Sequence, residues 1–360
     1  MTPTRRLLVG AVTVSAAMTL AACSGSPAEA GGEEPETSSA TDEMTTAESD
    51  GTVVLYAGRN LELVEPILEQ FTTETGIEVD IRDGKTAQLA AQILEEGERS
   101  PADVFLAQDA GALGAVAQAG LFEQLPAETL DLVADEFRSA DGEWVAVTGR
   151  ARVLVYNHDL VDQADLPDSV LDLTSADWNG RVGVAPTNAS FQSFVTAVRV
   201  QDGDEAAEEF LTGLAGNDPQ IYEKNGHILA AVDEGAVPVG LINHYYVFER
   251  AAELGVDPSE MAAQLHFFPD GDVGGLVNVS GVGLLTDQPD GDGQALVDFL
   301  LSEAGQQYFA EETREYPMIE GVPGPDGLPA LTDLQVPDVN LNDLDDLQGT
   351  VAMISEAGLS

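Results

Sequence analysis

The chain has 360 residues, and 64 acidic side chains against 14 lysines and arginines give a formal net charge of -50. Hydrophobic residues make up 44 %, a composition that builds folded cores, and a single core rarely extends past about 250–300 residues, so two lobes are predicted. The negative charge argues against nucleic acid as a partner, because counterion release needs a basic patch, and against anionic lipid bound through a basic face. The single cysteine rules out a disulfide framework within the chain and a CxxC metal or redox site.

The N-terminus has the pattern of an export signal. Arg5 and Arg6 precede an apolar stretch, 7–20, which is too short and too rich in alanine for a convincing bilayer span. The stretch ends Leu-Ala-Ala-Cys23, which resembles a bacterial lipobox and implies cleavage before Cys23, with lipid on its thiol and on the new amino group. Residues 1–22 are therefore interpreted as a lipoprotein signal peptide, the alternative being a plain signal peptide with an incidental cysteine.

Residues 23–51 are predicted to be an acidic, disordered tether between the membrane and the folded part. From residue 24 on, this segment holds eight acidic residues, no basic ones and almost no apolar ones. Such a composition cannot bury enough surface to offset the entropy lost on ordering. The mature protein is thus expected at the outer face of the cell membrane, in contact with it only through the lipid on Cys23.

The first folded stretch alternates strands and helices. Short apolar runs alternate with segments whose apolar residues recur at helical spacing. This order implies an α/β fold with a mainly parallel sheet covered by helices. The predicted strands are 52–57, 77–82 and 103–107, and the predicted helices are 61–71, 85–96 and 111–119.

A long β-rich stretch, 143–157, follows, and its length suits strands that pass between lobes. Two α/β lobes joined by several crossings predict a hinged cleft that closes on a ligand. The first lobe is expected to comprise 52–150 and about 276–315, and the second about 151–275 and 316–360. Further strands are predicted at 181–186, 237–243 and 277–286, and helices at 190–200, 205–214, 244–254, 294–301, 304–311 and 343–356.

The most specific chemical signal is the pair Tyr245 and Tyr246, which a buried strand delivers to a helix N-terminus. A phenol normally titrates near pH ~10, but a trivalent cation can deprotonate it, and phenolate oxygen suits ferric iron. The alternative is that both tyrosines only pack against the opposite lobe. Adjacent residues of a helix point about 100° apart, so both reach one ion only from an irregular junction ahead of the helix.

Six motifs together, although none alone, resemble those of the bacterial ferric-ion-binding proteins, the iron-receptor branch of the solute-binding proteins of ABC importers. The resemblance covers nearly all of residues 52–320. It implies a two-lobed, type II periplasmic-binding fold that carries Fe(III) to a membrane permease driven by an ATPase. The motifs are Tyr56-Ala-Gly58-Arg59-Asn60, Asp83-Gly84-Lys85 with Gln88-Leu-Ala, Pro101-Ala-Asp-Val-Phe105, Gly149-Arg150-Ala-Arg152-Val with Val155-Tyr156, Asn243-His-Tyr-Tyr246 and Glu315-Tyr316-Pro.

The resemblance assigns the two phenolate ligands to Tyr245 and Tyr246. Asn60 stands where many members have a histidine, and Gln108 stands where many have a glutamate. Asp109 is a ligand if the loop shifts by one residue. Because two of the four usual side-chain ligands differ, water or a synergistic anion such as carbonate or phosphate is expected to complete the iron shell.

His244 precedes the tyrosines and is a possible ligand, but it is more readily interpreted as pointing elsewhere or as supporting Tyr245 through a hydrogen bond.

An anion site is implied by the family's cradling segment at a strand-to-helix turn, where backbone N–H groups and a serine hydroxyl hold an oxyanion. Arg150 could pair with the anion bidentately, and Arg59 could neutralise it from the first lobe. The alternatives are that Asn188 or Ser190 caps a helix and that Arg150 or Arg152 forms a structural ion pair. The predicted anion site consists of Asn188, Ala189, Ser190, Asn225, Asn243, Arg150 and Arg59.

These patterns predict a monomeric iron(III)-binding receptor lipoprotein that does not catalyse a reaction. The sequence contains no Gly-x-Ser-x-Gly elbow, P-loop, HExxH or dinucleotide fingerprint. The alternative within the same class is a receptor for another small solute, an oxyanion or organophosphate, that uses the segment 187–190 without iron.

Overall fold

The computed structural model describes residues 51–285 and 291–359. The predicted signal peptide, Cys23 and most of the predicted tether lie outside these residues. Among the described helices, none combines the length and the apolar character needed to cross a membrane.

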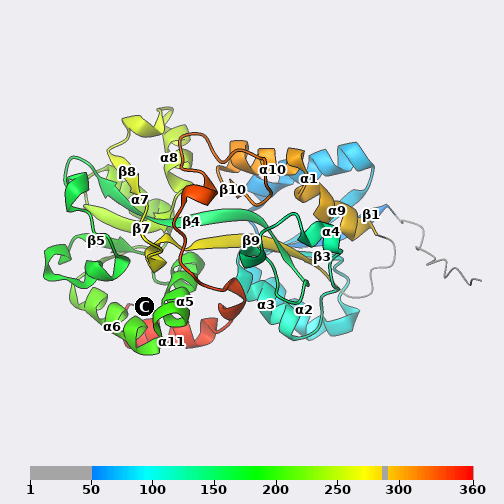
Figure 1. The fold of residues 1–360 in the computed structure, drawn as a ribbon, viewed down its shortest axis with the longest axis horizontal. Coiled ribbons are helices and arrows are strands. Elements are labelled where there is room, and N and C mark those ends of the chain that lie inside the picture. Colours follow the sequence, from blue (N-terminus) through cyan, green and yellow to red (C-terminus); the bar gives the residue numbers. More distant parts are fainter. Residues whose placement is uncertain (1–50, 286–290, 360) are drawn as a thin grey trace, which may run out of the picture. The chain divides into compact units, whose positions relative to one another are not determined.

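The first part of the chain forms the predicted parallel strands and covering helices (Figure 1). In the sheet, β1 lies between β2 and β3 and pairs with both in parallel. Helix α1 begins where the Asn60 side chain accepts a hydrogen bond from the Glu62 N–H, and it ends at Gly76 in the left-handed conformation. The elements are β1 Thr52–Ala57, α1 Leu61–Thr75, β2 Glu78–Asp83, α2 Thr86–Glu96, β3 Val104–Ala107, α3 Ala110–Gln118 and α4 Ala127–Leu130.

Strand β4, Val145–Asn157, links two groups of strands (Figure 1). Its first half pairs antiparallel with β9, Val277–Leu284, and its second half pairs antiparallel with β7, Val239–Asn243. The exchange of partners falls at Ala151, which is the last residue paired with β9. Every residue of β4 is buried, including the charged residues Arg150 and Arg152.

The second group of strands is again covered by helices. β5 pairs in parallel with β6 and β7, so the sheet order is β2-β1-β3-β9-β4-β7-β5-β6. Helix α7 and strand β8, which pairs with β4, are not predicted from the sequence. The elements are β5 Val182–Val184, α5 Ala189–Asp202, α6 Asp204–Gly216, β6 Gln220–Ile221, α7 Asn225–Asp233, α8 Tyr246–Leu254, β8 Ala263–His266, α9 Asp292–Leu300, α10 Glu303–Tyr308, β10 Tyr316–Pro317 and α11 Leu347–Glu356.

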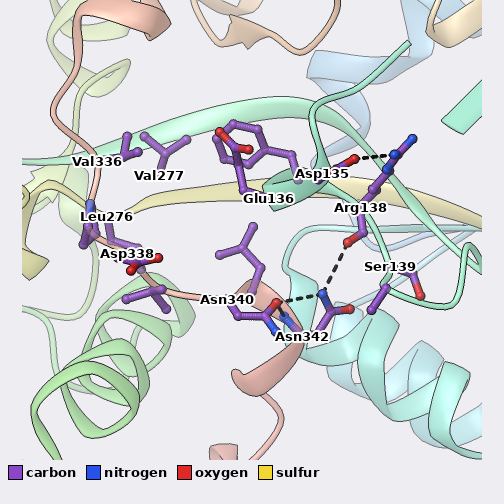
Figure 2. Close-up of a pocket in the computed structure, with 15 residues that line it drawn as sticks. Asp135, Glu136, Arg138, Ser139, Leu276, Val277, Val336, Asp338, Asn340 and Asn342 are labelled. Atoms are coloured by element: carbon purple, nitrogen blue, oxygen red, sulfur yellow. Dashed lines mark hydrogen bonds and ion pairs between the residues drawn. The ribbon is translucent and has the colours of Figure 1, made fainter. Parts of the chain in front are cut away.

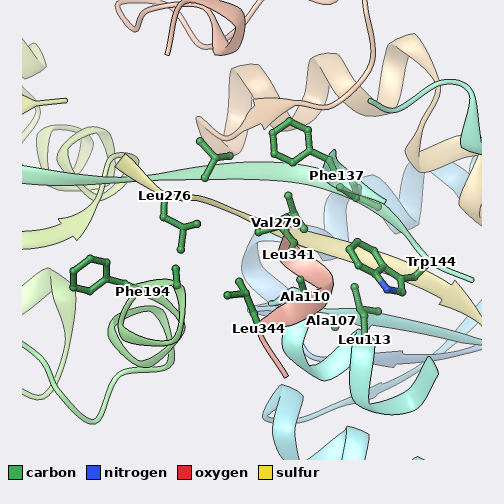
Figure 3. Packing of buried hydrophobic residues seen from close by; sticks show 14 of the residues in the cluster. Ala107, Ala110, Leu113, Phe137, Trp144, Phe194, Leu276, Val279, Leu341 and Leu344 are labelled. Carbon is green, nitrogen blue, oxygen red and sulfur yellow. The ribbon is translucent and has the colours of Figure 1, made fainter. Parts of the chain in front are cut away.

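The main hydrophobic core extends under both groups of strands. Figure 3 shows Trp144 and Leu113 of this core, and both side chains are fully buried. Gly281 of β9 allows this packing, because a Cβ there would lie 2.6 Å from Leu113 Cδ1. A smaller cluster around Val153, Val155 and Ile228 fills the other face near α7.

The C-terminal segment contacts both groups of elements. β10 pairs with the first half of β4, and Asn342 donates a hydrogen bond to the Arg138 carbonyl at 3.3 Å. From Asp346 onward the chain lies on α5, where Arg199 pairs with Asp346 at 2.8 Å. Between them, the Gln335 side chain accepts a hydrogen bond from the Asp270 N–H of the second group at 2.7 Å, so the predicted lobe boundary at 316 stays a prediction.

Candidate functional site

Tyr245 and Tyr246 lie at the junction between β7 and α8. The predicted helix start at His244 is wrong, because the His244 N–H still donates to the Ala151 carbonyl at 3.0 Å and α8 begins only at Tyr246. The two rings stack with centroids 4.4 Å apart and planes 27° apart. The junction therefore brings the two phenol rings side by side, which a regular helix would not do.

Tyr245 is only 6 % exposed, and its surroundings decide when its proton leaves. Burial raises the pKa of its phenol well above 10, and neighbouring Tyr246 raises it further, whereas the charge of Arg150 acts in the opposite direction. A phenol in this position keeps its proton at neutral pH unless a cation binds to its oxygen.

Arg59, Arg150 and Glu315 form a buried ion cluster, called here the Glu315 cluster. Arg59 Nη2 lies 2.8 Å from Glu315 Oε2, and Arg150 Nε lies 3.7 Å from Glu315 Oε1. Arg59 also donates to Ser280 Oγ at 2.7 Å, and Arg150 donates to the Gln108 carbonyl. Arg150 thus forms the ion pair of the alternative interpretation, and Arg59 is directed at Glu315 rather than at the predicted anion segment.

A second polar group, called here the Arg152 cluster, comprises Arg152, Asn188, Ser190 and Asn225. Ser190 Oγ accepts hydrogen bonds from Arg152 Nη1 at 3.1 Å and Asn225 Nδ2 at 2.9 Å. It donates to Asn188 Oδ1 at 2.6 Å, and Asn188 also caps α5. Asn188 and Ser190 of the predicted anion segment therefore lie together with Asn225. Asn188 also caps a helix, as the alternative interpretation expects.

Arg152 is the residue that sequence reasoning missed as an anion partner. In the described parts of the chain no carboxylate pairs with it, and its buried Nε and the Asn225 Oδ1 have no hydrogen-bond partner. Its guanidinium lies over the rings of Phe191 and Phe194 at 5.7 and 5.5 Å. Burial lowers the pKa of Arg152 to about 9, opposed by nearby Tyr246. The sequence did contain a signal for this role, because Arg150 and Arg152 are two residues apart on one strand and therefore face the same side.

A small cavity joins predicted residues from both parts of the chain. Its volume is about 10 Å³, roughly the space of one water molecule, so an oxyanion would enter only if the lining moved apart. Tyr245, Tyr246, Asn60 and Arg59 do not line it. The lining consists of Gln108, Asp109, Arg150, Arg152, Ala189, Ser190, Ser193, Asn243, Leu276 and Asn278.

Two of the possible iron ligands serve as helix caps. Asn60 is exposed and caps α1, and Asp109 caps α3 by accepting a hydrogen bond from the Ala112 N–H at 3.0 Å. Burial raises the pKa of the Asp109 carboxyl, while the Ala112 bond and Arg150 oppose that effect. Gln108 is held through its backbone, because its N–H donates to Thr86 Oγ1 at 3.2 Å.

His244 points away from the Tyr245 phenol, as one of the sequence-based interpretations expects, and its ring nitrogens contact backbone groups. Its Nδ1 accepts a hydrogen bond from the Ala151 N–H at 3.1 Å, and its Nε2 lies 2.7 Å from the Arg314 carbonyl oxygen. Burial lowers the pKa of the imidazole to about 4, so the ring is neutral. Because both ring nitrogens bind backbone groups, His244 has none left for iron or for the Tyr245 phenol.

A separate cavity lies elsewhere in the fold. Figure 2 shows it beside the start of β9, with a volume of about 800 Å³, lined by 135–140 and 336–342. It shares only Leu276 with the small cavity and contains no predicted site residue. Within the described ranges no group of three or more His, Cys, Asp or Glu side chains is placed to hold a metal, so tyrosine oxygens remain the candidate ligands.

Comparison with known proteins identifies the class. Residues 99–345 match the bacterial extracellular solute-binding protein family, and the chain belongs to that family. It is 33 % identical over 315 residues to the Fe(3+)-binding periplasmic protein of Serratia marcescens, covering 87 % of this chain and 92 % of that protein. It is 34 % identical over 310 residues to the major ferric iron-binding protein of Neisseria meningitidis serogroup B, covering 85 % and 93 %.

Solved structures agree with this assignment. Iron-bound HitA from Pseudomonas aeruginosa superposes with a TM-score of 0.79 at 38 % identity, covering 86 % of this chain and 99 % of that one. A Trichodesmium protein in complex with iron and citrate superposes with a TM-score of 0.76 at 26 % identity, covering 86 % and 100 %. The resemblance to ferric-ion-binding proteins, the two-lobed type II α/β fold and the assignment to solute-binding proteins rather than enzymes are confirmed.

Proposed function

We propose that this chain is the Fe(III) receptor of an ABC importer, anchored at the outer face of the cell membrane by lipid on Cys23. Relatives at 33 % and 34 % identity carry ferric iron-binding names, which supports iron as the cargo. In this role the protein is a monomer that delivers iron to a membrane permease powered by an ATPase.

The observation that carries the proposal is the tyrosine pair at the β7–α8 junction. The two phenol rings stack there with centroids 4.4 Å apart, and in this proposal one ion binds both oxygens in place of their protons. Two phenolates offset part of the trivalent charge, and hard oxygen donors suit Fe(III). Iron bound between the lobes favours the closed state to the extent that it binds that state more tightly.

A synergistic anion, carbonate or phosphate, is proposed to bind at the Arg152 cluster and to complete the iron shell. Arg152 is a buried cation without a carboxylate partner in the described part of the chain. The N-terminus of α5 supplies further donors to an oxyanion, and so does the Ser190 hydroxyl once it turns from Asn188 Oδ1 to the anion. Asn243 and Arg150, which line the same cavity, are proposed as further contacts.

The same unpaired arginine also favours a second candidate function, an oxyanion or organophosphate receptor that works without iron. A buried guanidinium recognises phosphate or carboxylate through two parallel hydrogen bonds. In that case the tyrosine pair would only line the site.

Visible absorption separates the two candidates, because a phenolate bound to Fe(III) absorbs visible light. Purified protein is loaded with ferric citrate, and the spectrum is compared with that of the Tyr245→Phe/Tyr246→Phe double variant. We expect colour in the wild type and none in the double variant. A colourless wild type, or colour that survives in the double variant, would contradict the iron assignment.

A further inference from the structure

His244 joins three separate segments of the fold. The residue directly precedes the tyrosine pair, and its imidazole is fully buried. One ring nitrogen binds Ala151, at the point where β4 exchanges β9 for β7. The other binds the carbonyl of Arg314, in the segment between α10 and β10.

The hydrogen-bond pattern fixes the tautomer of His244. The Arg314 carbonyl only accepts, so Nε2 carries the hydrogen, and the Ala151 N–H only donates, so Nδ1 accepts. The ring therefore makes both bonds at once in its neutral form, and each bond holds a different part of the backbone.

The Arg314 end of this bridge belongs to the first group of elements. The Gln306 side chain of α10 donates to the Val147 carbonyl of β4, and the Tyr308 hydroxyl donates to the Leu63 carbonyl of α1. Arg314 itself has a φ of 57°, in the left-handed region that non-glycine residues seldom adopt. The local backbone conformation thus sets the direction of the Arg314 carbonyl, and this carbonyl accepts the hydrogen bond from His244 Nε2.

We propose that His244 is a positioning residue, whose bond to the Arg314 carbonyl couples the tyrosine pair to the first lobe and holds the phenol oxygens in place for iron. The inference rests on the proposed function. It predicts that the bond persists when the metal is bound, and that its loss changes the tyrosine–iron geometry.

Two amide substitutions separate the two bonds of the ring. The His244→Gln variant places an amide N–H near the position of Nε2 and retains the bond to Arg314, but it loses the acceptor for Ala151. The His244→Asn variant places an oxygen near the position of Nδ1 and retains the bond to Ala151, but it loses the link to Arg314. Each variant leaves one buried backbone group unpaired, so both are expected to lower the Tm of the metal-free protein similarly.

The readouts are the rate of iron release to excess chelator and the wavelength of the visible band. We expect His244→Asn to release iron about tenfold faster with a shifted band, and His244→Gln to stay within about twofold of wild type with an unshifted band. Equal behaviour of the two variants in both readouts would overturn the inference. If the wild type itself takes up no iron, the proposed function fails instead.

A measurement on the wild type avoids any folding defect of the variants. We expect the Nε2–H signal of His244 to exchange slowly in the NMR spectrum, both in the metal-free protein and in protein loaded with diamagnetic Ga(III). If this signal is lost on loading while gallium is bound, the bond to Arg314 does not persist and the inference is wrong.

Discussion

Two buried arginine clusters stand close to the tyrosine pair, and they differ in how their charge is balanced. In the Glu315 cluster, one carboxylate lies between Arg59 and Arg150. In the Arg152 cluster, the guanidinium has only neutral hydrogen-bond partners among the described residues. A buried charge without a partner is costly, so the first cluster is suited to holding the fold, whereas the second is suited to receiving an anion.

The largest predicted effect comes from removing the only carboxylate of the Glu315 cluster. Glu315→Gln leaves Arg59 and Arg150 buried without a carboxylate, and it should lower the free energy of unfolding of the metal-free protein by about 3–5 kcal/mol. Chemical denaturation measures this loss. Glu312→Gln, an exposed change three residues away, is the control and should leave stability nearly unaltered. Equal stability of the two variants would contradict the structural role of the cluster.

Acid is predicted to release iron, because each phenol that binds as phenolate gives up a proton. The raised pKa of Tyr245 means that its proton is present at neutral pH and returns as the pH falls. With two phenolates, affinity should fall by about 100-fold per pH unit near neutrality, measured by competition with a chelator. The Tyr246→Phe variant should show a slope of about tenfold per unit. A pH-independent affinity in the wild type would rule out phenolate ligation.

Removing the Arg152 cation should lower the iron affinity and leave the stability intact, whereas Glu315→Gln should lower the stability. Arg152→Met retains a long apolar side chain next to the Phe191 and Phe194 rings but removes the cation. Iron affinity in phosphate buffer should fall by about 10- to 100-fold, because hydrogen bonds to a charged group are lost. The free energy of unfolding without metal should not fall, since a desolvated charge is gone. Lower stability together with unaltered iron affinity would identify Arg152 as structural.

The smallest effect is expected at Asn60, where the family resemblance places a possible ligand. Its side chain caps α1, so Asn60→Ala should cost about 1 kcal/mol of stability and leave the visible iron band unchanged. Asn60→Asp, which retains a capping oxygen, should restore the stability. A band that shifts in the alanine variant would indicate that Asn60 contacts the iron.

Most strands and most helices were predictable from the sequence because apolar runs and helical spacing mark them locally, whereas the short strands β6, β8 and β10 were missed. Helix α7, which begins at Asn225, was missed, and α8 was predicted two residues too early, because His244 continues the bonding to Ala151 on β4. That bonding depends on tertiary contacts between distant segments. The tyrosine pair was recognised from its place at the end of a buried strand, but its stacked arrangement was not predictable.

The sequence also could not predict which of Arg150 and Arg152 lacks a carboxylate partner. Both face the same side of β4 by the period of a strand, so local pattern does not separate them. What separates them is Glu315, which arrives from 165 positions further along the chain and approaches Arg150 but not Arg152. Such long-range pairing is decided by the fold, and so is the balance of charge around the candidate site.

The most direct test of the account is a crystal structure of iron-loaded protein with anomalous scattering recorded at the iron edge. The account predicts one strong peak within bonding distance of the hydroxyl oxygens of both Tyr245 and Tyr246. A peak that contacts neither phenol, or iron-loaded crystals with both hydroxyls turned away from the metal, would contradict it.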